Sequence, residues 1–249
     1  MAVPRFHLDR ALTLGESIEL PAAVAHHARN VLRLRSGDDV ILFNGGGGEF
    51  RARLSQGSTS GSPLRAEVLA FDQVEREARV RITLIQSLTS ADKSDWIVEK
   101  AVELGVARII LTPAARSTVR LDQARRTRRL QHWRDLAVAA CCQCGRNRLV
   151  PIEAADSLQQ ALAAAGPDTR LILDPDAARE IAIGEAVAGP LTLAVGPEGG
   201  FAPDELAQAQ QAGFIRARVG ARVLRTETAG LAAATAWLAL AGEFSSRRV

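Results

Sequence analysis

The sequence predicts an α/β protein in two parts, a small β barrel over residues 1–72 and a mostly parallel sheet flanked by helices over residues 73–249. Short strand-like runs separated by turn residues fill the first part. Strands and helices alternate from Arg79 onward, which is typical of a parallel sheet with helices on its faces. The polar stretch DQVEREAR, residues 72–79, separates the two patterns and marks the domain boundary.

The first part contains one expected helix and several strands. Pro21 begins the helical stretch PAAVAHHARNVL, because proline suits the first position of a helix. RSGDDVILFNGGGGEFRARL predicts two strands joined by a glycine-rich turn, and SQGSTSGSPLRAEVLAF predicts a loop and a further strand. His26 and His27 point to different helix faces and have no third ligand nearby, so a metal site is disfavoured.

The second part alternates between predicted strands and helices. Gly105 ends the first helix, and Pro203, Asp204 and Glu205 mark the start of a later one. The strands are expected at 79–88, 107–113, 170–175, 191–195 and 214–220, and the helices at 92–106, within 121–148, and at 176–187, 202–213 and 228–241.

Charge is distributed unevenly along the chain. The formal net charge is only +3, yet residues 73–150 carry 15 basic against 8 acidic residues. Lys93 and Lys100 are the only lysines, so the excess consists mostly of arginine. The basic run over 121–148 has two interpretations, a solvated charged face or a surface for an RNA backbone.

Composition indicates a cytoplasmic protein. The chain has no apolar run of membrane-spanning length, and its N-terminus lacks the layout of a signal peptide. All three cysteines lie between 141 and 144, which excludes a disulfide framework and fits a reducing compartment. Cys141 and Cys144 have CxxC spacing, but without a second pair packing is favoured over zinc.

Two glycine-bearing turns, LTLAVGPEGGF at 191–201 and VGARVLRTETA at 219–229, predict a small-molecule site. Each turn follows a strand and leads toward a helix, whose N-terminus offers unpaired N–H groups. Glu198 opposes phosphate, and no phosphate-binding lysine follows the glycines. A cofactor with adenosine and a cationic centre but no phosphate fits better, and S-adenosylmethionine is the obvious candidate.

These two motifs resemble the C-terminal motifs of the SPOUT methyltransferases, and most closely those of the RsmE family. The resemblance extends over almost the whole chain through PRFH, HHARNVLRLRSGD, FNGGGGEF, VEKAVELGV and AACCQCGRNR. Gln143 and Arg146 match the family pattern, whereas Cys142 stands where the family commonly has Glu. Any role of an acid at position 142 is therefore in doubt.

The resemblance implies a PUA-like barrel over 1–72 and a dimerising α/β domain over 73–249 with a trefoil knot. It also implies transfer of a methyl group from S-adenosylmethionine to N3 of a uridine in the decoding region of 16S ribosomal RNA, within the assembled small subunit. Three loops are expected to hold the cofactor. Their residues are Leu173, Gly196, Glu198, Gly199, Val219, Leu224, Arg225, Thr226, Thr228 and Ala229.

Chemistry at uracil N3 requires loss of a proton from an unpaired base. Arg225 is expected to stabilise the developing uracil anion. Glu198 and Glu227 are candidate bases, and each has the alternative role of holding a loop. RNA contacts are expected from several arginines, with surface ion pairs as the alternative: Arg5, Arg29, Arg33, Arg125, Arg126, Arg129, Arg146 and Arg148.

Two other functions remain open from the sequence. One is an RNA-binding or assembly factor that retains the barrel and the basic residues without chemistry. The other is a SPOUT enzyme that acts on transfer RNA or on a ribose hydroxyl. Cofactor binding separates the first from an enzyme, and mapping of the modified nucleoside separates the second.

Overall fold

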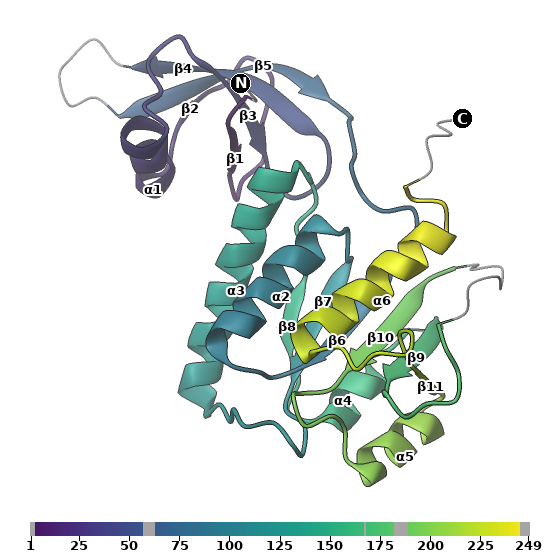
Figure 1. The fold of residues 1–249 in the computed structure, drawn as a ribbon. Coiled ribbons are helices and arrows are strands. Elements are labelled where there is room, and N and C mark those ends of the chain that lie inside the picture. The colour runs from purple at the N-terminus through teal and green to yellow at the C-terminus, as the bar shows by residue number, and fades with distance from the viewer. Residues whose placement is uncertain (1–2, 57–62, 167, 182–188, 245–249) are drawn as a thin grey trace. The chain divides into compact units, whose positions relative to one another are not determined.

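The computed structural model describes residues 3–56, 63–166, 168–181 and 189–244, and it confirms the α/β class (Figure 1). The chain forms two compact units. Unit 1 contains Met1–Arg76 and Cys141–Leu149, and unit 2 contains Glu77–Ala140 and Val150–Val249. The short segment Cys141–Leu149 thus belongs with the N-terminal residues, although the sequence suggested one division near residue 72.

Unit 1 is built on a five-stranded sheet with the order β1-β3-β4-β5-β2. The pair β1–β3 is parallel and the other pairs are antiparallel. Because no described residues pair β1 with β2, the predicted barrel is a curled half-barrel. The strands are β1 (Arg5–His7), β2 (Ser17–Glu19), β3 (Asp39–Phe43), β4 (Glu49–Gln56) and β5 (Leu64–Asp72).

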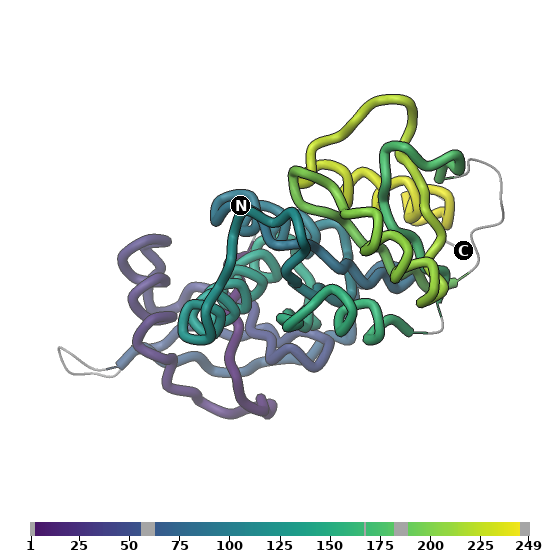
Figure 2. Tube along the Cα trace, turned by 90° about the horizontal axis from the view of Figure 1, so that it is seen from below, coloured from purple at the N-terminus to yellow at the C-terminus, as the bar shows by residue number. Residues whose placement is uncertain are grey.

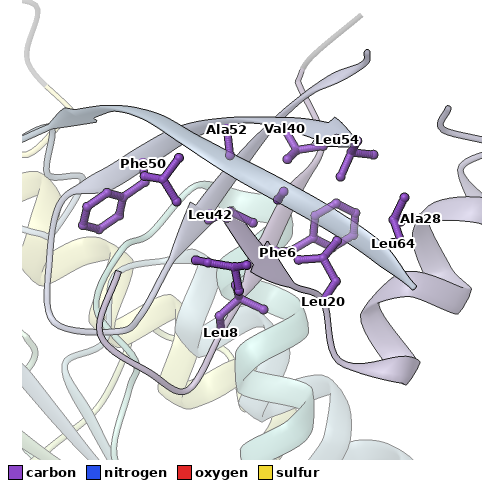
Figure 3. Close-up of a cluster of buried hydrophobic side chains, with 13 residues drawn as sticks. Phe6, Leu8, Leu20, Ala28, Val40, Leu42, Phe50, Ala52, Leu54 and Leu64 are labelled. Carbon is purple, nitrogen blue, oxygen red and sulfur yellow. The ribbon is translucent and has the colours of Figure 1, made fainter. Parts of the chain in front are cut away.

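The concave side of this sheet holds the hydrophobic core of unit 1 (Figure 3). Alternate residues along each strand point to the same face, so β3 supplies Val40 and Leu42, and β4 supplies Phe50, Ala52 and Leu54. The glycine-rich turn between β3 and β4 is needed for its backbone, because positive φ angles occur at Gly45, Gly47 and Gly48.

The helical stretch predicted from Pro21 is present, but its geometry changes midway. Helix α1 (Ala22–His26) continues into the π-helical turn η1 (His27–Val31). Arg33, two residues beyond, has a φ of 58°, the only positive φ among the described non-glycine residues. Such backbone conformations are uncommon for residues with a Cβ.

Unit 2 is built on a six-stranded sheet with the order β11-β9-β10-β6-β7-β8, in which every pair is parallel. The strands are β6 (Ile82–Ser87), β7 (Arg108–Thr112), β8 (Ile152–Ala154), β9 (Thr169–Leu173), β10 (Leu191–Val195) and β11 (Ile215–Ala217). The helices are α2 (Ala91–Glu103), α3 (Gln123–Cys144), α4 (Leu158–Ala163), α5 (Pro203–Gln211) and α6 (Thr226–Leu240).

Helices cover both faces of the unit 2 sheet. The core that α4 and α5 share with the sheet contains Ile85, Ile110, Ile172 and Ala194, one from each central strand. Helix α6 packs against β6 and β10 and also contacts α2. Strand β10 is buried at all five positions, as expected for a central strand between two layers of helices.

Two elements of unit 2 differ from expectation. The helix predicted at 176–187 is wrong for residues 176–181, which form a turn and a bridge instead, and residues 182–188 lie outside the described part. The Asp174 carboxylate accepts the N–H of Asp176, and Glu180 bridges to Arg218, so this backbone is held in a non-helical form. Strand β8 and helix α4 were not identified from the sequence.

Candidate cofactor pocket

A cavity of unit 2, with a volume of about 420 Å³, lies at the carboxyl ends of β9, β10 and β11. Its walls are the turn after β9, the loop after β10 and the segment 217–226 that leads into α6. Figure 2 shows this last segment in yellow-green, as a loop that extends between β11 and α6. Parallel sheets commonly bind ligands at this edge, because the loops after neighbouring strands meet there.

The structure brings most of the sequence-predicted cofactor residues to this one cavity. Those in its wall are Leu173, Gly196, Glu198, Val219, Leu224, Arg225, Thr226 and Ala229. Gly199, Glu227 and Thr228 lie in the two motif stretches, 191–201 and 219–229, but are not in the wall. Arg222 and Val223, which lie within the predicted stretch 219–229, are also in the wall, and further wall residues were not identified from the sequence: Lys93, Asp174, Pro175 and Arg218.

The loop after β10 is folded tightly on itself. A Cβ at position 196 would lie 3.1 Å from the backbone carbon of Gly200, so only glycine fits there without displacement. The N–H of Gly200 donates to the carbonyl of Pro197 at 2.9 Å, and Gly200 has a φ of 67°. These glycines are therefore required by the turn itself, which leaves the backbone of the loop open to the cavity.

The start of α6 is tied to this loop by hydrogen bonds beneath the cavity. The Thr226 hydroxyl donates to the carbonyl of Gly196 at 2.6 Å and accepts from Nε2 of Gln86 at 3.1 Å. Gln86 and Thr226 are both buried, so these bonds form away from solvent. Thr226 thereby fixes the helix N-terminus against the strand end that carries Gly196.

Two carboxylates and one lysine meet at the edge of the cavity. Nζ of Lys93 lies 2.9 Å from Glu198 and 3.6 Å from Glu227. Burial is the largest single influence and would raise the pKa of Glu198, but the hydrogen bond from Lys93, the backbone N–H of Glu198 and the charge of Lys93 together lower that pKa below its usual range. The same hydrogen bond raises the pKa of Lys93.

Lys93 comes from the first turn of α2, far from the glycine motifs in sequence, so no motif indicated it. Two facts offered a signal: it is one of only two lysines, and it follows a strand of the parallel sheet closely. The Glu227 oxygen that faces Lys93, Oε2, is buried. At 3.6 Å it is too far from Nζ for a hydrogen bond, and it has no hydrogen-bond partner among the described residues.

The turn after β9 is organised by a buried acid that the sequence analysis also missed. Asp174 is 7% exposed, and its carboxylate accepts a hydrogen bond from Nε of Arg216 at 2.6 Å. Its backbone N–H donates to Ala217 across the sheet, which joins the ends of β9 and β11. Arg218 lines the cavity beside them, and its buried Nε has no hydrogen-bond partner among the described residues.

Arg225 differs from these paired side chains. It lies at the residue before α6, is exposed, and forms no ion pair within the described part of the chain. Arg222, also in the wall, is likewise exposed. A guanidinium without an acidic partner is available to a substrate that carries or develops negative charge.

Arg5 and Arg146, which were predicted to contact RNA, are held within unit 1. Arg5 donates to Glu49 at 2.5 Å and to Oδ1 of Asn147 at 2.5 Å, and its side chain is 12% exposed. Arg76 donates to Glu49 at 2.9 Å. Arg146 is 3% exposed. Buried arginines that are committed to internal partners cannot reach a phosphate, so the structure favours a role in the fold for both.

Glu49 is the acidic centre of this arrangement, which we call the Glu49 cluster (Glu49, Arg5, Arg76 and Asn147). Burial opposes ionisation of Glu49, but hydrogen bonds from the two arginines and from Asn147 dominate and lower its pKa to about 2. Asn147 also donates to the carbonyl of Val74 at 2.7 Å. The cluster therefore binds the segment Cys141–Leu149 to the sheet of unit 1.

The other predicted RNA contacts vary in their surroundings. Arg33 is exposed, Arg29 is half-buried, and Arg148 is 54% exposed although it pairs with Glu75 at 3.2 Å. In unit 2, Arg125 is 66% exposed, and its one ion pair among the described residues is with Asp122 at 3.3 Å. Arg126 is bound to Asp156 and the carbonyl of Ala154, and Arg129 donates to Asp95 and stacks on Trp133.

The cysteine segment shows no sign of metal chemistry. Among the described residues, no group of three or more His, Cys, Asp or Glu side chains is placed to hold a metal ion. Burial raises the pKa of the Cys142 thiol, which leaves it less reactive than an exposed cysteine. No helix within the described ranges is long and apolar enough to cross a membrane.

Comparisons with known proteins agree with this geometry. Residues 76–238 match the RNA methyltransferase domain family, and residues 20–60 match the RNA methyltransferase PUA domain family. The ribosomal RNA small subunit methyltransferase E of Mycobacterium bovis is 33% identical over 94% of this chain and 90% of its own. The Bacillus subtilis protein of the same name is 29% identical over 85% of both chains.

Two solved structures are similar over nearly the whole chain. The ribosomal RNA small subunit methyltransferase E of Neisseria gonorrhoeae, bound to S-adenosyl methionine, is 36% identical with a TM-score of 0.87, and the match covers 96% of this chain and 98% of that one. The putative methyltransferase Lpg2936 of Legionella pneumophila, in complex with the same cofactor, is 29% identical with a TM-score of 0.88, over 97% and 98%. The chain therefore belongs to the ribosomal RNA small subunit methyltransferase E family.

Proposed function

We propose that this protein transfers a methyl group from S-adenosylmethionine to N3 of one uridine in the decoding region of 16S ribosomal RNA. The observation that carries the proposal is the cavity of about 420 Å³, whose wall combines strand-end backbone, acidic residues and the exposed Arg225. The Neisseria and Legionella relatives, which hold S-adenosylmethionine, support the choice of cofactor.

The wall of the cavity contains two acids, Glu198 and Asp174, and four cations, Lys93, Arg218, Arg222 and Arg225. Because Glu198 pairs with Lys93 and Asp174 with Arg216, charge does not select the ligand here, and the choice of S-adenosylmethionine is supported by the relatives that hold it. Backbone groups around Leu173, Gly196 and Val219 are proposed to hold the adenosine. The buried Nε of Arg218 is a donor without an internal partner, and a ribose oxygen or carboxylate would satisfy it.

When bound, the cofactor supplies an electrophilic methyl group, and the chain must align the acceptor nitrogen and assist loss of its proton. Arg225 is proposed to donate to the uracil carbonyl oxygens as negative charge develops. Glu198 is a weak candidate base because Lys93 holds it ionised with a lowered pKa. Glu227 is the better candidate, because its Oε2 lies 3.6 Å from Nζ of Lys93, farther than Glu198, and accepts no hydrogen bond among the described residues.

RNA binding is proposed to use arginines that are exposed or half-buried, and Arg5 and Arg146, which are held within unit 1, are left out. The proposed contacts in unit 1 are Arg29, Arg33 and Arg148, and those in unit 2 are Arg125, Arg126 and Arg129. The substrate is proposed to be the assembled small subunit, and the protein is proposed to act as a homodimer. The trefoil knot implied by the resemblance stays a prediction.

The test is methyl transfer from labelled S-adenosylmethionine to small subunits isolated from a strain that lacks this activity. The proposal expects incorporation into 16S RNA and its loss in Arg225→Ala. Absence of transfer to both subunits and free RNA, with cofactor binding intact by calorimetry, would overturn it.

A further inference from the structure

A second cavity of unit 2, of about 380 Å³, lies at the same edge of the sheet as the cofactor pocket. Its wall contains Leu88, Leu111 and Ala155, which lie at or just past the carboxyl ends of β6, β7 and β8. The cofactor pocket lies at the ends of β9, β10 and β11. Each half of the six-stranded sheet therefore carries one cavity at its carboxyl edge.

One loop, residues 113–122, connects the two cavities. On one side, Arg116 donates to the carbonyl of Gly199 at 3.0 Å, and the N–H of Ala115 donates to Glu205 at 2.7 Å. Glu205 also accepts from Ala202, so Ala115 is fixed at the start of α5 beside the cofactor loop. On the other side, Val119, Arg120 and Leu121 line the second cavity.

The chemistry of the second cavity suits a nucleotide. Leu88, Leu111, Pro113 and Val119 provide apolar surface, and the Gln123 amide can both donate to and accept from a base edge. Proteins that bind single-stranded RNA recognise an unstacked base by stacking a side chain on it and by hydrogen bonds to its edge, and arginine commonly takes part. The volume is sufficient for one nucleotide.

Charge around the cavity has the sign that this ligand requires. Arg120 is exposed and has no ion-pair partner among the described residues. Arg126 crosses the wall but is neutralised by Asp156, whose side chain is 72% exposed. Asp122 already accepts the N–H of Arg125 at the start of α3, so the helix N-terminus is not the anion site. Arg120 is therefore the group that meets the phosphate.

We propose that this second cavity binds an unstacked nucleotide of the RNA substrate, a neighbour of the methylated one, with Arg120 on its phosphate and Gln123 on its base. The inference rests on the proposed function. It adds a specificity site on the same sheet edge, and the loop 113–122 joins that site to Gly199 of the cofactor loop.

The first test is kinetic and uses the full-length enzyme with small subunits. Arg120→Ala removes the phosphate contact, and Ala114→Phe fills the cavity from its half-exposed rim. Each is expected to raise KM for RNA about tenfold while the Kd for S-adenosylmethionine stays within about twofold of wild type, consistent with the loss of one base or phosphate contact. Arg128→Ala, exposed on the following helix α3 and outside the cavity wall, is the matched control and should change KM much less.

The second test does not depend on catalysis. A short single-stranded RNA carrying 4-thiouridine is crosslinked to the protein by light, and the crosslinked peptides are identified by mass spectrometry. Crosslinks within 113–123 that disappear in Ala114→Phe are expected. An enzyme that crosslinks there but transfers no methyl group would refute the proposed function and not this site.

Unchanged KM in both variants, with crosslinks elsewhere, would overturn the inference. So would a change of oligomeric state in Ala114→Phe with unchanged KM for RNA, because that result would assign the cavity to a protein segment. Arg120→Ala keeps the test decisive if Ala114→Phe does not fold, since Arg120 is exposed.

Discussion

Arginine residues have opposite surroundings in the two units. In the Glu49 cluster of unit 1, Arg5 and Arg76 surround one buried carboxylate, and their charge is used within the fold. At the cofactor pocket of unit 2, Arg225 is exposed and has no ion pair among the described residues. The same residue type therefore stabilises a unit in one place and stays available to a substrate in the other.

The difference lies in the distribution of acids and not of arginines. Glu49 is 8% exposed, and its charge is acceptable in that position only because two guanidinium groups face it. At the pocket, Glu198 accepts a hydrogen bond from Lys93, and Glu227 lies 3.6 Å from the same ammonium group. Arg225 forms no ion pair among the described residues, so its guanidinium stays available to a substrate.

The largest effect is expected from Arg225→Ala. Loss of a donor to a developing anion should reduce the single-turnover rate of methyl transfer about 10²–10³-fold. The Kd for S-adenosylmethionine, measured by calorimetry, should change little. Arg222→Ala, an exposed arginine in the same pocket wall, is the control and should keep most of the activity. A rate near wild type in Arg225→Ala would remove Arg225 from the chemistry.

The next effect concerns stability and separates the two units. Glu49→Gln leaves Arg5 and Arg76 without their anion, and we expect a loss of about 3 kcal/mol in the free energy of unfolding of unit 1. Hydrogen exchange measured by mass spectrometry should become faster in the strands of unit 1 and change little in those of unit 2. Asp39→Asn, which breaks an exposed pair with Arg53 on the same sheet, should change exchange little. Equal effects of the two variants would contradict a structural role for the cluster.

Acid should weaken the Glu49 cluster in a defined range. The pKa of Glu49 is lowered from 4.5 to about 2, so the unfolded chain binds more protons between these values. The stabilisation is complete above pH 4.5 and is lost as the pH falls through about 2. Urea unfolding at pH 6 and pH 3 should show this loss in wild type and a smaller one in Glu49→Gln. An equal loss of unfolding free energy in wild type and in Glu49→Gln would show that Glu49 does not cause the acid effect.

The smallest effect is expected at Lys93. Lys93→Met removes the contact that ties the loop carrying Glu198 to α2, and the displaced loop should bind the cofactor about threefold more weakly, as expected for the loss of a partly exposed ion pair. Lys93→Arg should restore much of it. A Lys93→Met enzyme with unaltered cofactor Kd and unaltered pH profile would show that the ion pairs are incidental.

Sequence reasoning located the cofactor pocket because its two motifs follow strands of one parallel sheet. Strand ends in such a sheet lie at one edge, so adjacency in the fold follows from topology. The α/β class and the parallel sheet were predictable for the same reason. Lys93 was missed because it lies in the first turn of α2, outside the motif VEKAVELGV of that helix, and reaches the pocket through its side chain.

The RNA contacts were harder to predict, since exposure is not visible in a sequence. Arg5 meets Glu49 from 44 residues away, and it meets Asn147 from 142 residues away. Nothing near Arg5 in the chain indicates either partner. The sequence therefore predicted an RNA contact for Arg5, whose guanidinium binds side chains within unit 1. Arg33 and Arg125 are exposed, as an RNA contact requires.

The central claim is methyl transfer to one uracil nitrogen in 16S RNA, and nucleoside mapping tests it most directly. Small subunits lacking the modification would be incubated with the enzyme and isotope-labelled S-adenosylmethionine, and the RNA would then be digested and examined by mass spectrometry. The account predicts label in 3-methyluridine at a single position in the decoding region. Label in a ribose 2′-O-methyl group or in another base, or no label at all, would contradict it.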